Sequence, residues 1–327
     1  MLLVSMNTRV SVIVLNWNGR KWLEKCLSSI LGQDITENFE VILVDNGSTD
    51  DSVKYVRERF SQVKVIELEE NYGFAEGNNL GLKHARGDYI VFVNTDTEAM
   101  KGWLQNLVKA TDEHKDYQIL CSIQFPSQER NRVRTLNAFG YPMPSPSESE
   151  LAITDSIFAS GGCFLIRRSW VSKLGGLFDP NFFCNSEDLD LSLRTILLGG
   201  RIGYVRDSRI YHYIGGSSFQ SSKMLYFSER NILFVYYKLF SLKNFARIFF
   251  VQIAYLFGRL FARNRQLSNT FGMMKGVMGF FFGFHLYLNY RKSFMVDKKR
   301  NDKYVFERFL YRGRKQKTIL KRAIYGV

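Results

Sequence analysis

The first 114 residues alternate between short apolar runs and helical segments, and this alternation constrains the fold more than any other feature. Residues 9–17 (RVSVIVLNW) form a β-branched apolar run, typical of a strand buried on both faces of a sheet. The pattern predicts further strands at 39–44, 63–68 and 89–93, and helices at 20–31, 50–60, 75–85 and 103–114. Strands separated by helices predict right-handed βαβ units and a mostly parallel sheet of the α/β class.

The charges divide the chain into two regions. Residues 1–217 contain 23 Lys+Arg and 27 Asp+Glu, a balance of −4, whereas residues 218–327 contain 22 Lys+Arg and 4 Asp+Glu, a balance of +18. The basic excess of the whole chain therefore lies in its last third. We expect the two regions to face different environments.

The cysteines and the N-terminus indicate a reducing compartment. The four cysteines lie far apart and form no C-x-x-C pair, which predicts reduced thiols rather than a zinc site or a disulfide framework. Asn7 and Arg9 interrupt the short apolar start before a signal-peptide core can form. The N-terminal region of the protein is therefore predicted to be cytoplasmic.

Polar, glycine-containing segments follow three successive predicted strands: DNGSTD from Asp45, NYGFAEGNN from Asn71, and NTD from Asn94. Ligands of open α/β sheets bind beyond the carboxyl ends of the strands. A carboxylate and an amide there can bind a base and a ribose, a helix N-terminus can bind a phosphate, and an acid can bind a divalent cation. Taken singly, each segment is equally typical of a turn followed by a helix N-cap.

Two common nucleotide-binding classes lack their motifs here. The turn after the first strand, residues 15–19 (LNWNG), does not match the G-x-G-x-x-G of a dehydrogenase. The chain also contains no G-x-x-x-x-G-K-[ST] segment, which argues against a P-loop NTPase.

Seven segments in order resemble one known family: VIVLNWNG, DNGSTD, NYGFAEGNN, VNTDT, SGGCFLIRR, FDPNFFCNSEDLDLSLR and HYIGGSS. Together they resemble the inverting glycosyltransferases of family 2, which have the GT-A fold, and particularly the rhamnosyltransferase-like members from bacteria and archaea. The resemblance covers about residues 9–218. It implies an α/β, Rossmann-like GT-A domain that transfers a sugar from a nucleotide-diphosphate donor.

The resemblance implies a role for each residue that follows a strand. Asp45 would contact the nucleobase, and Asp96 would be the last residue of the D-x-D metal motif, holding Mg²⁺ or Mn²⁺. His212 would contact the metal or the diphosphate. The remaining implied residues are Asn16, Ser48, Asn71, Asn78 and Asn94 around the nucleotide and donor, and Gly161, Gly162 and Glu187 on the acceptor side. Asn94 departs from the family pattern, which has an aspartate at that position.

Residues 185–191 (NSEDLDL) place three acids at the predicted start of a helix, where the helix dipole stabilises carboxylates. Asp190 and Arg194 are four residues apart, which predicts a structural ion pair. The resemblance implies that Asp188, the second residue of the E-D pair, is the catalytic base. A carboxylate there could accept the proton of an acceptor hydroxyl as it attacks the anomeric carbon.

Two apolar, aromatic segments at residues 245–262 and 271–288 are interrupted by cations. Basic, aromatic helices of this kind suit the surface of an anionic membrane rather than a span across it. The same helices could instead pack on the catalytic domain or form a homo-oligomer interface. Nucleic-acid binding is not expected, because the segments lack polar spacers and a recognisable motif.

We therefore predict a catalytic domain at residues 1–218 and a helical, membrane-associating region at 219–327, on the cytoplasmic face of the cell membrane. The predicted acceptor is a hydroxyl of a lipid-linked or cell-surface glycan. An irregular, proline-containing loop at 125–150 is expected to shape the acceptor site. The alternative is a catalytically inactive nucleotide-sugar-binding or scaffold protein, and Asn94 is the feature that favours it.

Overall fold

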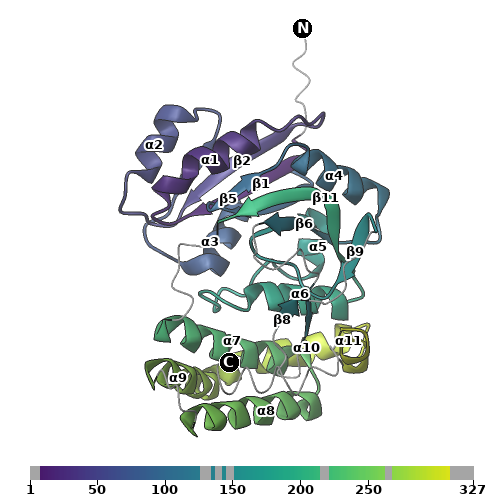
Figure 1. The fold of residues 1–327 in the computed structure, drawn as a ribbon. Coiled ribbons are helices and arrows are strands. Elements are labelled where there is room, and N and C mark those ends of the chain that lie inside the picture. Colours follow the sequence, from purple (N-terminus) through teal and green to yellow (C-terminus); the bar gives the residue numbers. More distant parts are fainter. Residues whose placement is uncertain are drawn as a thin grey trace. The chain divides into compact units, whose positions relative to one another are not determined.

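The computed structural model describes residues 8–125, 134–136, 142–144, 151–213, 221–261 and 267–309 (Figure 1). The chain forms two units, and each is assembled from separate stretches of sequence. The first contains residues 1–133, 146–183 and 200–216, and the second contains 134–145, 184–199 and 217–327. The units therefore differ from a linear division at residue 218, because the segment 184–199 belongs with the C-terminal helices.

The N-terminal half of the first unit is the alternating α/β arrangement that the sequence predicts. Its parallel strands have the order β3-β2-β1-β4 and its helices follow them along the chain. The elements are β1 (Val10–Asn16), α1 (Arg20–Leu31), β2 (Phe39–Asp45), α2 (Ser52–Arg59), β3 (Lys64–Glu67), α3 (Gly73–Leu82), β4 (Tyr89–Asn94) and α4 (Trp103–Glu113). Since Asn16 pairs with Asp45 and Leu15 with Asn94, the carboxyl ends of β1, β2 and β4 meet at one edge of the sheet.

The rest of the sheet is mixed. The order continues β4-β10-β6-β11-β5, with β10 antiparallel to both of its neighbours, β11 parallel to β6, and β5 and β9 antiparallel to β11. The elements are β5 (Thr97–Ala99), β6 (Ile119–Phe125), β9 (Ile153–Ser156), β10 (Cys163–Arg167), α5 (Arg168–Lys173) and β11 (Ile202–His212). His212 pairs with Thr97, so the end of β11 lies beside the loop that follows β4.

The buried strands explain why this sheet forms. Val12, Ile13 and Val14 of β1 are 0% exposed, as expected for a strand covered by helices on both faces. Trp103 of α4 is also fully buried, and its indole Nε1 donates a 2.9 Å hydrogen bond to Ser122 Oγ. The packed sheet provides a rigid support for the polar side chains that follow its strands.

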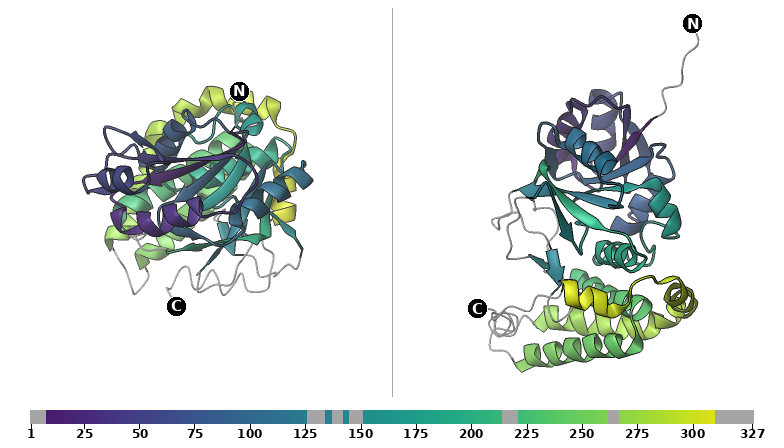
Figure 2. Two further views of the ribbon diagram at one scale, coloured as in Figure 1. Left: turned by 90° about the horizontal axis from the view of Figure 1, so that it is seen from above. Right: turned by 90° about the vertical axis from the view of Figure 1, so that its right-hand side faces the viewer.

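The second unit consists mainly of helices that lie side by side (Figure 2). Its elements are β7 (Arg134–Leu136), β8 (Pro142–Pro144), α6 (Glu187–Leu197), α7 (Ser222–Leu239), α8 (Leu242–Phe261), α9 (Leu267–Gly283), the 3₁₀ turn η1 (Phe284–Tyr287), α10 (Leu288–Asp297) and α11 (Asp302–Phe309). Strands β7 and β8 pair with each other inside the segment predicted to be an irregular loop. The other residues of 126–150, and Gly215-Gly216-Ser217, lie outside the described residues.

Helices α7 and α9 are in direct backbone contact. A Cβ added at Gly272 would lie 2.3 Å from the Ser222 carbonyl oxygen, and one at Gly276 would lie 2.6 Å from the Tyr226 carbonyl oxygen. Only glycine permits such an approach between two helices. Within the described residues, no helix is long and apolar enough to span a bilayer.

Candidate functional site

The end of β2 carries a buried polar cluster that unites three predicted residues. Asn16 Nδ2 donates to Asp45 Oδ1 at 2.8 Å and to Ser48 Oγ at 3.2 Å, and the Ser48 backbone N–H donates to Asp45 Oδ2 at 2.9 Å. Asn16 is 0% and Asp45 3% exposed. Each carboxylate oxygen has a second acceptor position, so Asp45 can still accept a hydrogen bond from a ligand.

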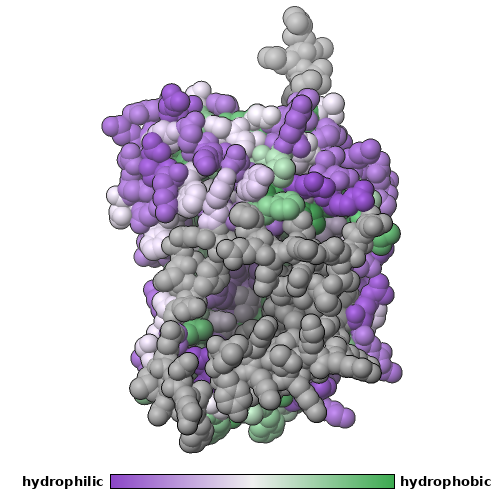
Figure 3. Space-filling view, viewed as in Figure 1, coloured by the Kyte–Doolittle hydropathy of each residue, from purple (hydrophilic) through white to green (hydrophobic). Residues whose placement is uncertain are grey.

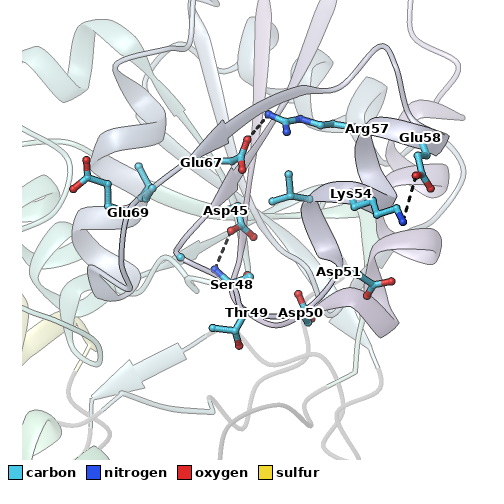
Figure 4. Close-up of a pocket in the computed structure, with 13 residues that line it drawn as sticks. Asp45, Ser48, Thr49, Asp50, Asp51, Lys54, Arg57, Glu58, Glu67 and Glu69 are labelled. Carbon is cyan, nitrogen blue, oxygen red and sulfur yellow. Dashed lines mark hydrogen bonds and ion pairs between the residues drawn. The ribbon is translucent and has the colours of Figure 1, made fainter.

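Asp45 lines a cleft of about 730 Å³ (Figure 4). The lining residues are Asp45, Gly47, Ser48, Thr49, Asp50, Asp51, Val53, Lys54, Arg57, Glu58, Glu67, Leu68 and Glu69. Six of them are acids, and the two cations are already paired, Arg57 with Glu67 and Lys54 with Glu58. Such a surface favours the N–H and O–H donors of a base and a ribose and disfavours a phosphate.

Asn71 helps to form the turn before α3 through Asn46, the amide that follows Asp45. Asn46 Nδ2 donates to Asn71 Oδ1 at 3.0 Å, while Asn46 Oδ1 accepts from the Tyr72 N–H at 3.0 Å. Asn46 is only 2% exposed. The amide that the sequence suggested for a base or a ribose thus uses both its oxygen and its nitrogen within the protein, as a buried amide at a strand end must.

At the N-terminus of α3, which the sequence analysis left open as a phosphate site or a capped turn, two backbone N–H groups already have partners. The Gly73 N–H donates to Asn71 Oδ1 at 2.8 Å, and the Phe74 N–H donates to the Phe183 carbonyl at 2.7 Å. Asn78 lies within the helix, 1% exposed, and donates to the Phe74 carbonyl at 2.9 Å. These three groups therefore already have hydrogen-bond partners inside the protein.

Asp96 and His212 form a second polar pair, beyond β4 and at the end of β11. Asp96 Oδ1 lies 3.1 Å from His212 Nε2, and both side chains are partly exposed. His212 Nδ1 lies 3.0 Å from Gln124 Oε1 on β6, so the ring donates from Nδ1 and its Nε2 faces the carboxylate. A divalent cation placed between the ring nitrogen and the carboxylate would be attracted by both groups.

The donor set fits a divalent metal ion. Adjacent oxygen or nitrogen ligands of an octahedral ion, each at about 2.1 Å, lie about 3.0 Å apart, close to the observed separation. Mg²⁺ is usually bound by one or two protein ligands together with phosphate oxygens and water. Among the described residues, no group of three or more His, Cys, Asp or Glu side chains is placed to hold a metal. Asp96 and His212 would therefore share the ion with the diphosphate.

The glycines predicted on the acceptor side lie next to this pair. A Cβ added at Gly162 would lie 2.9 Å from the His212 ring, so glycine is needed here to make room for the imidazole. The Gly162 carbonyl accepts a 3.2 Å hydrogen bond from the Asn94 N–H. Gly161 is partly exposed. Asn94 holds the loop through its carbonyl, which accepts from Thr97 Oγ1 at 2.7 Å.

Glu187 and Asp188 lie in the first turn of α6, in the second unit. Asp188 is partly exposed, and its Oδ1 accepts from the Leu189 N–H at 2.8 Å. Glu187 is 7% exposed, and burial, together with the neighbouring Asp188, raises its pKa well above the usual range. Glu187 thus retains a proton more readily than an ordinary glutamate, and the two adjacent acids have different chemistry.

The predicted pair of Asp190 and Arg194 is confirmed, with Arg194 Nε 2.8 Å from Asp190 Oδ2. Lys238 of α7, which the sequence analysis did not identify, lies 2.9 Å from the other oxygen, Oδ1. Asp190 is 0% exposed and Lys238 2% exposed. Asp190 is therefore structural, which leaves Glu187 and Asp188 as the acids of this helix that could take part in chemistry.

The arrangement has the GT-A class of α/β fold, as comparison with solved structures shows. The crystal structure of GalNAc-T7 with UDP, GalNAc and Mn²⁺ matches with a TM-score of 0.62 and 16% identity, over 88% of this chain and 58% of that one. The family model described as Glycosyl transferase family 2 matches residues 11–175. The chain belongs to glycosyltransferase family 2.

Two curated relatives show how similar this chain is in sequence to other proteins of known name. The poly(ribitol-phosphate) β-N-acetylglucosaminyltransferase TarS of Staphylococcus aureus is 26% identical over 211 residues, 62% of this chain and 35% of that protein. The O-antigen biosynthesis protein RfbC of Myxococcus xanthus is 26% identical over 224 residues, 64% of this chain and 18% of that protein. The chain thus matches about a third or less of the length of these curated relatives.

Proposed function

We propose that this protein is an inverting glycosyltransferase that transfers a sugar from a nucleotide-diphosphate donor to an acceptor hydroxyl. The observation that carries the proposal is the placement of two complementary sites at one edge of the sheet. The acidic cleft at Asp45 suits a base and a ribose, and the pair of Asp96 and His212 suits a metal-bound diphosphate. A nucleoside diphosphate presents these two groups together.

The proposed catalytic base is Asp188. Its carboxylate accepts the proton of the acceptor hydroxyl as the new bond forms at the anomeric carbon, and the nucleoside diphosphate departs from the opposite face. A single displacement of this kind inverts the anomeric configuration. Mg²⁺ or Mn²⁺, held by Asp96 and His212, would neutralise the charge of the departing diphosphate. Glu187, adjacent to the base, faces the acceptor in this proposal.

The identity of the donor can be tested directly. We expect one nucleotide sugar to raise the melting temperature of the protein, and to do so more strongly with Mn²⁺ present. The panel should include nucleotide-linked rhamnose, which the sequence resemblance implies. It should also include UDP-GlcNAc and UDP-GalNAc, since the names of the relatives specify those sugars. A flat response across nucleoside diphosphates and their sugars would contradict the proposal.

The alternative function is a nucleotide-sugar-binding or scaffold protein without catalysis. Asn94, which replaces the first aspartate of the D-x-D motif, is the observation that favours it. The two functions differ in turnover. Release of nucleoside diphosphate that depends on protein and acceptor supports the transferase, whereas stoichiometric binding without release supports the scaffold.

We further propose that the second unit binds an anionic membrane surface and that the acceptor is a lipid-linked or cell-surface glycan. Residues 230–296 contain ten Lys+Arg and no Asp or Glu. Helices α8 and α9 expose large apolar side chains: Phe250, Phe257, Phe271, Met278, Phe281 and Phe282. Apolar side chains are also visible over α8 at the lower edge of Figure 3.

The spacing of these side chains supports the membrane proposal. Phe250 and Phe257 are seven residues apart on α8, as are Phe271 and Met278 on α9, so each pair lies on one helical face. Exposed cations, including Lys243, Arg247 and Lys275, accompany these residues. Apolar side chains would enter the interface while each cation near anionic lipid contributes about 1 kcal/mol. The resulting location would be peripheral, at the cytoplasmic face.

We expect the double variant Phe281→Glu/Phe282→Glu to lose vesicle binding by about tenfold or more, because burying each phenylalanine is worth about 1.5–3 kcal/mol. The measurement is co-sedimentation with phosphatidylcholine vesicles that contain phosphatidylglycerol. Leu151→Glu, which also replaces an exposed apolar residue, is the matched control. The membrane proposal would be contradicted if the wild-type protein did not bind these vesicles. If it formed a dimer instead, and the double variant were monomeric, the surface would be a homo-oligomer interface.

A further inference from the structure

We propose that Asn231, on helix α7, is a positioning residue that holds the turn from which Asp188 projects. The inference rests on the proposed function of Asp188 as the base, and it assigns the C-terminal helices a part in catalysis. All of the residues that carry it belong to the second unit.

The turn before α6 has an unusual backbone. Asn185 and Ser186 both have φ of 68°, the left-handed conformation that few residues other than glycine and asparagine adopt, so Ser186 is the more strained of the two. A strained residue such as Ser186 costs on the order of 1–3 kcal/mol and persists only where the surrounding structure enforces it. Glu187 and Asp188 follow immediately. The orientation of the proposed base therefore depends on what enforces this turn.

Helix α7 makes the contacts that enforce it. Asn231 Nδ2 donates to the Cys184 carbonyl at 2.9 Å and to the Asn185 carbonyl at 2.8 Å. Asn231 is 0% exposed, and its Oδ1 accepts from Arg230 Nε at 2.9 Å. In return, Asn185 Nδ2 donates to the Met224 carbonyl at 3.1 Å. Both hydrogens of one buried amide are thus used on two successive carbonyls of the turn.

A third contact fixes the same helix further along. Lys238 Nζ lies 2.9 Å from Asp190 Oδ1, between two side chains that are almost completely buried. Met224, Asn231 and Lys238 are spaced by seven residues, which places them on one face of α7. We call this face, residues 224, 231 and 238, the α7 clamp. It contacts residues on both sides of Glu187 and Asp188.

A positioning role for Asn231 predicts that its removal lowers kcat alone, whereas a purely structural role predicts a parallel loss of kcat and nucleotide affinity. Removing its amide leaves two carbonyls of the turn without that donor, so the strained conformation loses its support while the bundle keeps its apolar packing. We expect the turn to relax and Asp188 to move away from its working position. A displacement of about 1 Å can lower the rate of a reaction by about 10².

The test compares Asn231→Ala with Gln252→Leu in the full-length protein. Gln252 is a matched control, because it is also buried in the helices, at 1% exposure, and neither of its polar atoms has a hydrogen-bond partner among the described residues. We expect Asn231→Ala to lower kcat by about 10² with the donor KM and the Kd for nucleoside diphosphate unchanged. The pH dependence of kcat should also shift, whereas Gln252→Leu should keep the wild-type values.

The outcomes separate this inference from the proposed function. If wild-type protein transfers no sugar, the proposed function fails. Suppose that the wild-type protein is active and that Asp188→Asn is inactive, so that the proposed function stands. The positioning role is then wrong if folded Asn231→Ala retains kcat within about twofold of the wild-type value. A parallel loss of kcat and nucleotide affinity in Asn231→Ala would also overturn the positioning role. Asn231→Ser keeps one donor, so its kcat should lie between those of the wild-type protein and Asn231→Ala. It replaces the alanine variant in the test if that variant does not fold.

Discussion

Asp188→Asn is expected to lower the rate of sugar transfer by about 10²- to 10⁴-fold, the usual contribution of a general base. The variant keeps the size and hydrogen-bonding shape of the side chain but cannot accept the proton of the acceptor hydroxyl. The loss corresponds to about 3–5 kcal/mol in the activation free energy. Steady-state kcat, measured by release of nucleoside diphosphate, gives the rate, and calorimetry gives the Kd for the nucleotide sugar.

We expect the Kd to be unchanged in Asp188→Asn, because the proposal assigns Asp188 to proton transfer and assigns the nucleotide to other residues, Asp45 and Asp96. Asp297→Asn, at the exposed end of α10, removes a carboxylate of the same unit and is the matched control. Near-wild-type turnover in Asp188→Asn would exclude Asp188 as the base. The neighbouring Glu187 would then be the acid to test.

Removal of divalent cations is expected to abolish transfer and to weaken nucleoside diphosphate binding. With the metal absent, Asp96 faces the diphosphate as an uncompensated negative charge, and each 1.4 kcal/mol of lost interaction costs about tenfold in affinity. EDTA should stop turnover, and Mn²⁺ or Mg²⁺ should restore it. Calorimetric titration of UDP and GDP with and without Mn²⁺ provides a second measurement that does not depend on turnover.

Single-site variants locate the metal effect in the structure. Asp96→Ala and His212→Ala should each reduce the Mn²⁺-dependent gain in nucleotide affinity by about tenfold or more. Asp207→Ala, which removes an exposed acid from the same strand as His212, should retain that gain. Turnover that continues in EDTA, together with nucleotide affinity that does not respond to Mn²⁺, would exclude the metal assignment.

The sequence predicted the first half of the fold well, for a physical reason. Strands that are buried on both faces are mostly apolar, so β1, β2 and β4 were evident as runs of at least four consecutive apolar residues. The later strands were harder to predict because nothing local indicates that β10 enters the sheet antiparallel, between β4 and β6. The pairing of β7 with β8 was likewise not evident from a proline-containing segment.

The candidate site was predicted in part. Asp45 and Asp96 could be chosen because ligands gather beyond strand ends, and His212 was implied by the family resemblance. The structure places Asn16 with Asp45 and His212 with Asp96. The partners that orient them were missed because they are distant in sequence: Gln124 is 88 residues from His212. The partner of the Phe74 N–H at the start of α3 could not be predicted for the same reason, since it is the remote Phe183 carbonyl.

The discontinuous composition of the second unit limits how this protein can be recombined with its relatives. A chimaera joined at residue 218 would keep Glu187 and Asp188 from one parent and take α7 from the other. The residues that replace Asn231 and Lys238 would then come from one parent, and the turn and the Asp190 carboxylate that they contact would come from the other. A chimaera keeps these contacts only if residues 184–199 and the C-terminal helices are transplanted together, as one inherited block.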